Sequence, residues 1–240
     1  MTADAKAPAN DPAAHELLRG AHQVGYRFPD RFSGFRAALQ FANDQGRTLG
    51  TVEVNAPNQI TLDLDTGEAA RHWVLQEMAS IVGHRWPASY EQQDGRYNLT
   101  LEPGNHPLGQ LIRFNDDRFS SAYRVREGRL SQINRGMGKM RFTINLLEHV
   151  QVGDGRIVPT NFTVTYWDIS DGRLVRADAY TDRYVPVDGV YLPALRRVIT
   201  ASDDGLTVQE MVLTGHEILP EGSTAQEVPA NREHPQSRAG

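Results

Sequence analysis

The chain has 240 residues, of which 39% are hydrophobic and 8% aromatic, so it can form a core and is not disordered throughout. Its net charge of −5 comes from 30 acidic and 25 basic residues that are interspersed, which argues against a nucleic-acid partner. The absence of cysteine excludes disulfides, thiolate nucleophiles and cysteine-bound zinc.

The opening segment, MTADAKAPANDPAAHELL, lacks the basic and apolar regions of a secretory signal peptide. No stretch of the chain stays apolar over the roughly 20 residues that a membrane-spanning helix requires. We therefore expect a cytoplasmic protein without a membrane span.

Residues 1–10 are small and polar and predict a flexible arm. Asp11 and Pro12 then predict the start of a helix, because a carboxylate caps the first turn and proline favours the first helical position. Apolar residues recur at helical spacing after Pro12, as Leu18 illustrates, and they extend this helix to about residue 25.

From Phe35 the apolar residues alternate with polar ones, which is typical of half-buried strands. Residues 35–41, 48–54 and 60–64 predict three antiparallel strands joined by short turns.

A second helix is predicted from Asp65, which with Glu68 favours a helix N-terminus, to Gly83, where glycine favours a helix end. The residues expected on its apolar face are Ala70, Trp73, Val74, Met78, Ile81 and Val82.

Alternating segments continue as far as residue 218 and are clearest at 140–146 and 162–166. Together they predict an α+β fold: a large curled antiparallel sheet of about ten strands, forming a half-barrel or open barrel, with the N-terminal helix and one long helix packed on it. We expect one domain over residues 11–219, a ligand cleft on the concave face of its sheet, and a disordered tail over 220–240.

Four short segments carry a resemblance to a known family. They are GFRAALQF, GTVEV, the His84–Arg85 pair after the second helix, and the hairpin YLPALRRVI with DDGLTV. The chain resembles the domain-of-unknown-function family numbered 3386 across roughly residues 13–219. More loosely, the layout of helix and curled sheet is similar to the lipoprotein carriers of the bacterial periplasm, whose sheet wraps around acyl chains.

His84, Arg85 and Trp86 follow the predicted end of the second helix. Cations at a helix C-terminus interact favourably with its dipole, and Trp86 can pack on the sheet, so helix-end electrostatics explains the triplet without a ligand. The alternative places His84 and Arg85 at the rim of the cleft, where they bind an anionic group or move a proton.

Residues 176–184, RADAYTDRY, place Asp178, Tyr180, Asp182 and Tyr184 on one face of a strand, because strand side chains alternate. This pattern fits a solvent-facing surface or cross-strand pairs better than a pocket lining. Arg135, within NRGMGKMRF, is a further candidate for ligand contacts.

Neither a metal site nor a cofactor is predicted. The chain has eight histidines but no ligand spacing such as HExxH. Lys139 is followed by Met140 rather than Ser or Thr, so NRGMGKMRF is no phosphate loop, and neither GxSxG nor a dinucleotide fingerprint occurs.

Two functional hypotheses follow. The first is a binding module that holds a small apolar or amphipathic molecule in the cleft, with Arg85, Trp86, Tyr180 and Arg135 as ligand contacts. The second is a cofactor-independent enzyme, such as a cyclase, isomerase or lyase. There His84 would be the acid or base, assisted by Tyr90 or Asp182, and Arg85 would stabilise negative charge. A scaffolding role has only the acidic tail in its favour, and the oligomeric state is left open.

Overall fold

The computed structural model describes residues 9–221. These residues form two α-helices, one short 3-10 helix and twelve strands. In chain order the elements are α1 (Pro12–Val24), β1 (Phe35–Asn43), β2 (Gly46–Ala56), β3 (Gln59–Leu64), α2 (Glu68–Gly83), η1 (Asp94–Arg96), β4 (Leu99–Glu102), β5 (Gln110–Phe114), β6 (Ala122–Arg126), β7 (Arg129–Met137), β8 (Met140–Val152), β9 (Arg156–Asp168), β10 (Leu174–Val187), β11 (Val190–Ser202) and β12 (Gly205–Ile218).

All twelve strands belong to one antiparallel sheet, in the order β3-β2-β1-β12-β11-β10-β9-β8-β7-β6-β5-β4. Sequential strands pair throughout except for β3 and β4, which form the two open edges of the sheet, and β1 also pairs with β12. The predicted α+β class and antiparallel sheet are confirmed, but the predicted count of about ten strands is too low.

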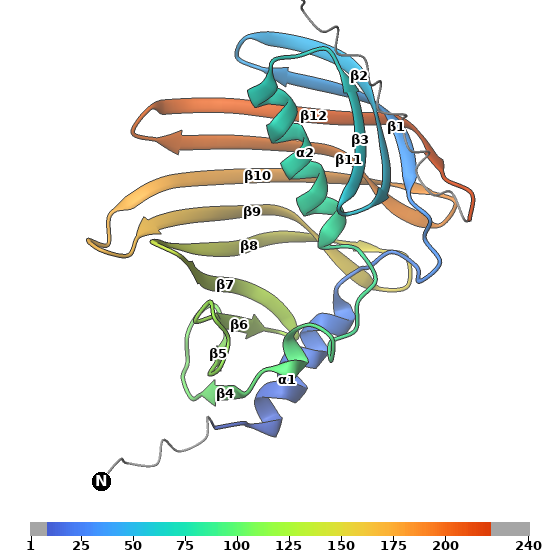
Figure 1. The fold of residues 1–240 in the computed structure, drawn as a ribbon. Coiled ribbons are helices and arrows are strands. Elements are labelled where there is room, and N and C mark those ends of the chain that lie inside the picture. The colour runs from blue at the N-terminus through green and yellow to red at the C-terminus, as the bar shows by residue number, and fades with distance from the viewer. Residues whose placement is uncertain (1–8, 222–240) are drawn as a thin grey trace, which may run out of the picture.

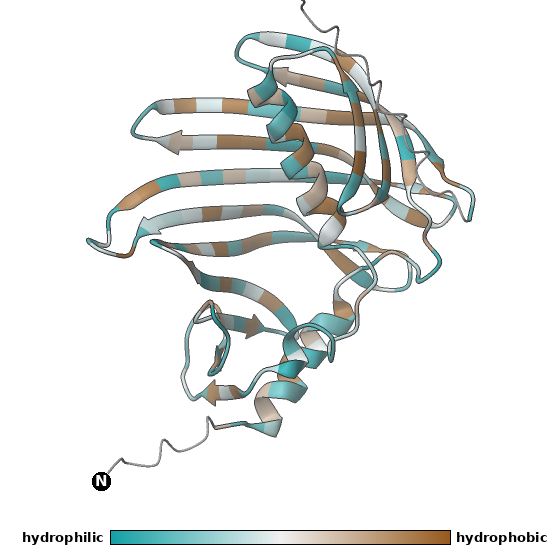
Figure 2. Ribbon diagram, in the orientation of Figure 1, coloured by the Kyte–Doolittle hydropathy of each residue, from teal (hydrophilic) through white to brown (hydrophobic). Residues whose placement is uncertain are grey.

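The chain between the two open edges crosses the concave side of the sheet. This segment contains α2, and Figure 1 shows α2 lying across the sheet while the strands curl around it. Figure 2 shows hydrophobic and hydrophilic residues alternating along most strands, as a sheet with one covered face requires. The ends of the two helices therefore meet the middle of the sheet, β7–β10, from its concave side.

The apolar core is divided into two clusters. One surrounds α2 and is built mainly from β1–β3, β11 and β12, with Phe35, Phe41 and Met78 among its buried side chains. The other joins α1 to β4–β6 through Leu18, Leu99 and other residues. The concave residues of β7–β9 between these clusters are only partly buried in most cases, which leaves room for a cavity.

The first helix begins as the sequence predicts. The carboxylate of Asp11 accepts a hydrogen bond from the backbone N–H of Ala13 at 2.9 Å, and Pro12 occupies the first helical position. Ala14 and Leu18 bury one face of α1. The helix ends at Val24, one residue before the predicted limit.

The second helix differs from its prediction at the start and agrees at the end. It begins at Glu68 with Gly67 as a cap that makes no side-chain hydrogen bond, so Asp65 does not cap it. Gly83 is its last residue. Trp73 is only partly buried, whereas Met78 on the same predicted face is fully buried.

The ends of the chain are described in part. The predicted flexible arm lies outside the described residues except for Ala9 and Asn10. Asn10 accepts hydrogen bonds from the backbone of Leu99 at 3.1 Å and from His15 at 2.7 Å. The predicted tail lies outside the described residues beyond Glu221. Neither helix within residues 9–221 is long and apolar enough to cross a membrane.

Candidate ligand-binding site

A cavity of about 450 Å³ lies between the concave face of the sheet and the ends of both helices. Its floor comes from the central strands β7–β11, and its other walls come from α1, the segment after α1, and the end of α2. The polar, charged and aromatic or aliphatic side chains that line it include His22, Arg27, His84, Arg85, Asp94, Phe142, Ile144, Leu146, Phe162, Val164, Tyr166, Tyr180, Asp182 and Arg196.

The floor is apolar because of the strand alternation that the sequence shows. Ile144 on β8 pairs with Val164 on β9, and both side chains line the cavity. The neighbouring pair, Asn145 and Thr163, points to the opposite face of the sheet and is absent from the lining. The clean alternation over 140–146 and 162–166 thus produces the wall of the cavity rather than a filled core.

Aromatic rings extend this floor onto β10. The rings of Phe162 and Tyr180 are stacked in parallel, with centroids 4.4 Å apart and an interplanar angle of 8°. The guanidinium group of Arg196 lies 5.2 Å from the centroid of the Tyr180 ring. Such stacked pairs hold a flat, rigid surface toward the cavity.

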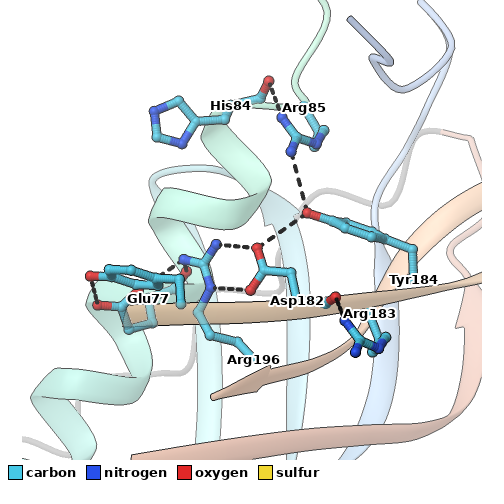
Figure 3. Close-up of polar contacts among 8 residues, drawn as sticks. Glu77, His84, Arg85, Asp182, Arg183, Tyr184 and Arg196 are labelled. Atoms are coloured by element: carbon cyan, nitrogen blue, oxygen red, sulfur yellow. Dashed lines mark hydrogen bonds and ion pairs between the residues drawn. The ribbon is translucent and has the colours of Figure 1, made fainter. Parts of the chain in front are cut away.

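A buried ion cluster joins this floor to α2. Arg196 on β11 donates to both carboxylate oxygens of Asp182, at 2.8 and 2.7 Å, and to the carboxylate of Glu77 on α2, at 2.8 Å (Figure 3). Arg196 is 3% exposed and Asp182 is 1% exposed. Burial acts to lower the pKa of Arg196, but Asp182 and Glu77 together outweigh it, so the pKa is raised.

The predicted solvent exposure of the Asp178–Tyr184 face is therefore wrong. The four side chains do share one face, but it is the concave one, and Asp178 and Asp182 are both buried. The predicted cross-strand pairs are present: Tyr180 stacks on Phe162, and Asp182 faces Arg196 across the β10–β11 ladder. Acidic residues can face inward here because each meets a cationic or hydroxyl partner.

His84 is placed by the last turn of α2, where its backbone N–H donates to the carbonyl oxygen of Ser80 at 3.1 Å. Its side chain lines the cavity and remains exposed, because it faces open space rather than packed atoms. The protein atoms around the cavity displace part of the water near the ring, and this desolvation lowers the pKa of His84 to about 4, with the nearby cations Arg85 and Arg196 acting in the same direction. The imidazole is neutral at pH 7.

Arg85 begins a chain of polar contacts that ends in the ion cluster. Its Nη2 donates to the hydroxyl of Tyr184 at 3.3 Å, and this hydroxyl donates to Asp182 at 3.4 Å (Figure 3). The guanidinium also lies 5.7 Å from the centroid of the Tyr184 ring. Arg85 therefore occupies the boundary between the cavity and the buried ion cluster.

Four of the seven predicted site residues line the cavity: His84, Arg85, Tyr180 and Asp182. The other three do not, for different reasons.

Trp86 packs edge-on against Phe28 and Phe32 in the core around α2, with ring centroids 6.2 and 5.7 Å apart. Tyr90 is buried beside α1, where its hydroxyl bonds to Nδ1 of His15 at 2.8 Å. Their side chains are thus used in packing.

Arg135 lies behind the lining. It donates to the hydroxyl of Tyr123 and is 4.0 Å from a carboxylate oxygen of Asp94, which does line the cavity. Burial raises the pKa of Asp94, while Arg135 and Arg27 act to lower it. Arg135 can therefore influence a ligand through Asp94 but does not itself form the wall.

Sequence reasoning missed Arg27 and Arg196. Arg196 could have been found, because adjacent Arg196 and Arg197 in a strand must point to opposite faces, so one of them faces the core. Arg27 gives no such signal, since it lies between two elements. Its position follows from a backbone bond, Phe28 N–H to the carbonyl of Arg85 at 2.7 Å, which joins the segments after α1 and α2.

A second hollow, of about 660 Å³, lies at the start of α2 against the β1–β2 turn. Polar residues including Asn43, Gln45, His72 and Gln76 line it, and it contains none of the predicted site residues. Within residues 9–221, no three histidine, aspartate or glutamate side chains are grouped so that they could hold a metal ion. The prediction of no metal stays a prediction.

The family model for proteins of unknown function DUF3386 matches residues 9–219, so the chain belongs to this family. The search of curated proteins found no match to this chain. Among solved structures, it is similar to a DUF1329 family protein from Desulfovibrio piger, at 11% identity and a TM-score of 0.24, over 88% of this chain and 93% of that one. A likeness at this level carries no functional argument. The family resemblance inferred from the four sequence segments is confirmed.

Proposed function

We propose that this protein binds a small amphipathic molecule in the cavity on the concave face of its sheet. The observation that carries the proposal is the cavity of about 450 Å³, which lies in the size range of small-molecule sites. Protein interiors are normally close-packed, and exposed apolar surface costs about 25 cal/mol per Å². Apolar side chains that line a cavity of this size therefore favour a ligand that covers them.

The distribution of polar groups supports an amphipathic ligand rather than a purely apolar one. Ile144, Phe162 and Val164 form the apolar floor, whereas His84 and Arg85 stand at the opposite wall on the end of α2. A ligand with an apolar body and a polar end matches both surfaces at once.

An enzyme acting in the same cavity is the second candidate, favoured by the neutral imidazole of His84 facing the cavity. Three observations make the enzyme hypothesis the weaker of the two. A base with a pKa of about 4 is weak at neutral pH. Tyr90 is hydrogen-bonded beside α1, and both carboxylate oxygens of Asp182 are held by Arg196, so neither is free to assist His84. A cyclase, isomerase or lyase would need another acid or base.

Native mass spectrometry of the purified protein tests both candidates. We expect a retained small molecule that is released on denaturation and identified by its mass. If incubation leaves the bound molecule unchanged, binding is supported, whereas its conversion to a product of different mass or retention time would favour the enzyme. A protein that carries nothing, and that binds none of the alkyl probes described below, would contradict the proposed function.

A further inference from the structure

Two arginines on the wall of the cavity lack an anionic partner. Arg27 and Arg85 both line the cavity, and among residues 9–221 neither has a carboxylate oxygen within 4.0 Å. Other arginines on the concave side differ: Arg196 is paired with two carboxylates and Arg176 with Asp178. Asp94 also lines the cavity and attracts Arg27, but it lies beyond this distance, so neither guanidinium is directly paired with a carboxylate in the described part of the chain.

The contacts of Arg27 are all with neutral acceptors. Its Nη1 donates to the carbonyl oxygens of His84 and Trp86 at 3.3 and 3.4 Å. Its Nη2 contacts Nε2 of His22 at 2.9 Å and the side-chain oxygen of Gln93 at 3.1 Å. These bonds fix the position of the guanidinium without neutralising it.

The two guanidinium groups are close to each other. Nη1 of Arg85 donates to the carbonyl oxygen of His84 at 3.3 Å, the same oxygen that accepts from Arg27 at 3.3 Å. The two Nη1 atoms are therefore separated by no more than twice this distance. In both residues the Nε–H is buried and has no hydrogen-bond partner in the described part of the chain.

This juxtaposition of two cations is electrostatically unfavourable unless an anion is bound beside them. Two like charges in a partly dehydrated wall repel each other, and burial and then Arg85 lower the pKa of Arg27. The neighbouring His22 is kept neutral rather than cationic, because burial and Arg27 lower its pKa. An oxyanion bound beside the two guanidinium groups would offset the repulsion, and each Nη of Arg85 makes only one contact and so has a second N–H to donate to it.

We propose that Arg27 and Arg85 bind the anionic head group of the ligand, a carboxylate or a phosphate ester, while its alkyl or ring portion lies against Ile144 and Phe162. This inference rests on the proposed function and narrows the ligand class to amphipathic organic anions. A guanidinium group can bind either a carboxylate or a phosphate through two hydrogen bonds, so the measured affinities must show which of the two is preferred.

Isothermal titration calorimetry with four ten-carbon probes tests the head-group preference. The probes are decanoate, decyl phosphate, decanol and decyltrimethylammonium, which share a tail and differ in charge. We expect the better of the two anions to bind at least about tenfold more tightly than decanol, corresponding to about 1.4 kcal/mol, and the cation to bind more weakly than decanol. The ranking of decanoate against decyl phosphate identifies the preferred oxyanion.

Single substitutions test whether Arg27 and Arg85 cause the preference for an anionic head group. Arg27→Met and Arg85→Met should each weaken binding of the preferred anion at least about tenfold and change decanol affinity by less than about threefold. Arg31→Met, which removes an exposed arginine close to Arg27 in sequence, should leave both affinities unchanged. Thermal melting confirms that each variant is folded.

Equal affinity for decanol and the anions in the unmutated protein would overturn the anion site but leave the proposed function standing. Failure of all four probes to bind, together with the absence of a retained molecule in native mass spectrometry, would contradict the proposed function itself. Because this comparison uses the unmutated protein, it decides the question even if Arg27→Met does not fold.

Discussion

Arg196 and Asp182 form a two-pronged ion pair across the β10–β11 ladder, with both donor–acceptor distances below 2.9 Å and both side chains buried. The pair is adjacent to the cavity on one side and to Glu77 of α2 on the other. It therefore fixes α2 on the sheet at the point where the helix presents His84 and Arg85. The same ion pair therefore contributes both to the stability of the fold and to the geometry of the proposed site.

Replacing Arg196 by methionine should destabilise the protein by about 3–5 kcal/mol, measured by chemical denaturation. The substitution removes one partner of a buried ion pair and leaves two carboxylates without a counter-ion. Arg197→Met is the matched control. Arg197 lies on the exposed face of β11 and pairs with Glu210 of β12, so its loss should cost less than about 1 kcal/mol. Equal losses for the two variants would contradict a structural role of the buried pair.

Met78→Ala should destabilise the protein more than Trp73→Ala. Met78 is fully buried under the sheet, and its truncation should cost about 3 kcal/mol by leaving a cavity. Trp73 is partly exposed and packs on Phe41 with ring centroids 5.7 Å apart, so we expect about 2 kcal/mol. Urea denaturation of both variants measures the order, and a larger loss for Trp73→Ala would show that Trp73 contributes more to the core than its exposure indicates.

Filling the cavity should block ligand binding without loss of the fold. Ile144→Trp adds bulk on the cavity floor, and we expect affinity for decanol to fall at least about tenfold while thermal melting changes by only a few degrees. Leu147→Trp is the control, because Leu147 is on the same strand but 61% exposed. Undiminished binding by Ile144→Trp would place the ligand elsewhere on the protein.

The local elements of this fold are largely readable from the sequence. Asp11 caps α1 as its residue type predicts, and α2 ends at Gly83. The alternation from Phe35 onward identifies strands because a half-buried sheet imposes a period of two. The pairing of β1 with β12 is not readable, since it joins segments at opposite ends of the domain and no local pattern encodes it.

The candidate site could be predicted only in part, for the same reason. His84 and Arg85 are conspicuous after Gly83, and they do line a cavity. Whether the Asp182 face points inward depends on Arg196, a partner on another strand that a single-strand pattern does not specify. Arg27 reaches the cavity through a loop contact with Arg85, which only the tertiary structure brings about.

Unfolding of His84→Gln at different pH values tests whether the cavity environment acts on this histidine. The pKa of His84 is lowered from 6.5 to about 4 by burial in the cavity wall and by the cations Arg85 and Arg196. Between these two pH values the unfolded chain binds a proton that the folded protein does not, so falling pH favours unfolding. The contribution of neutral His84 is complete above pH 6.5 and is lost as pH falls toward 4.

The wild-type protein should therefore lose stability more steeply than His84→Gln as pH falls through this window, and the two curves should run parallel above it. Asp94, Glu77 and Asp178, whose pKa values are raised by burial, act with the opposite sign. They are present in both proteins, so their contribution cancels in the difference. Parallel curves over the whole range would mean that the His84 ring is hydrated as in the unfolded chain. The cavity would then be open to bulk water at the end of α2, and the ligand head group would have to be held in a wet rather than an enclosed site.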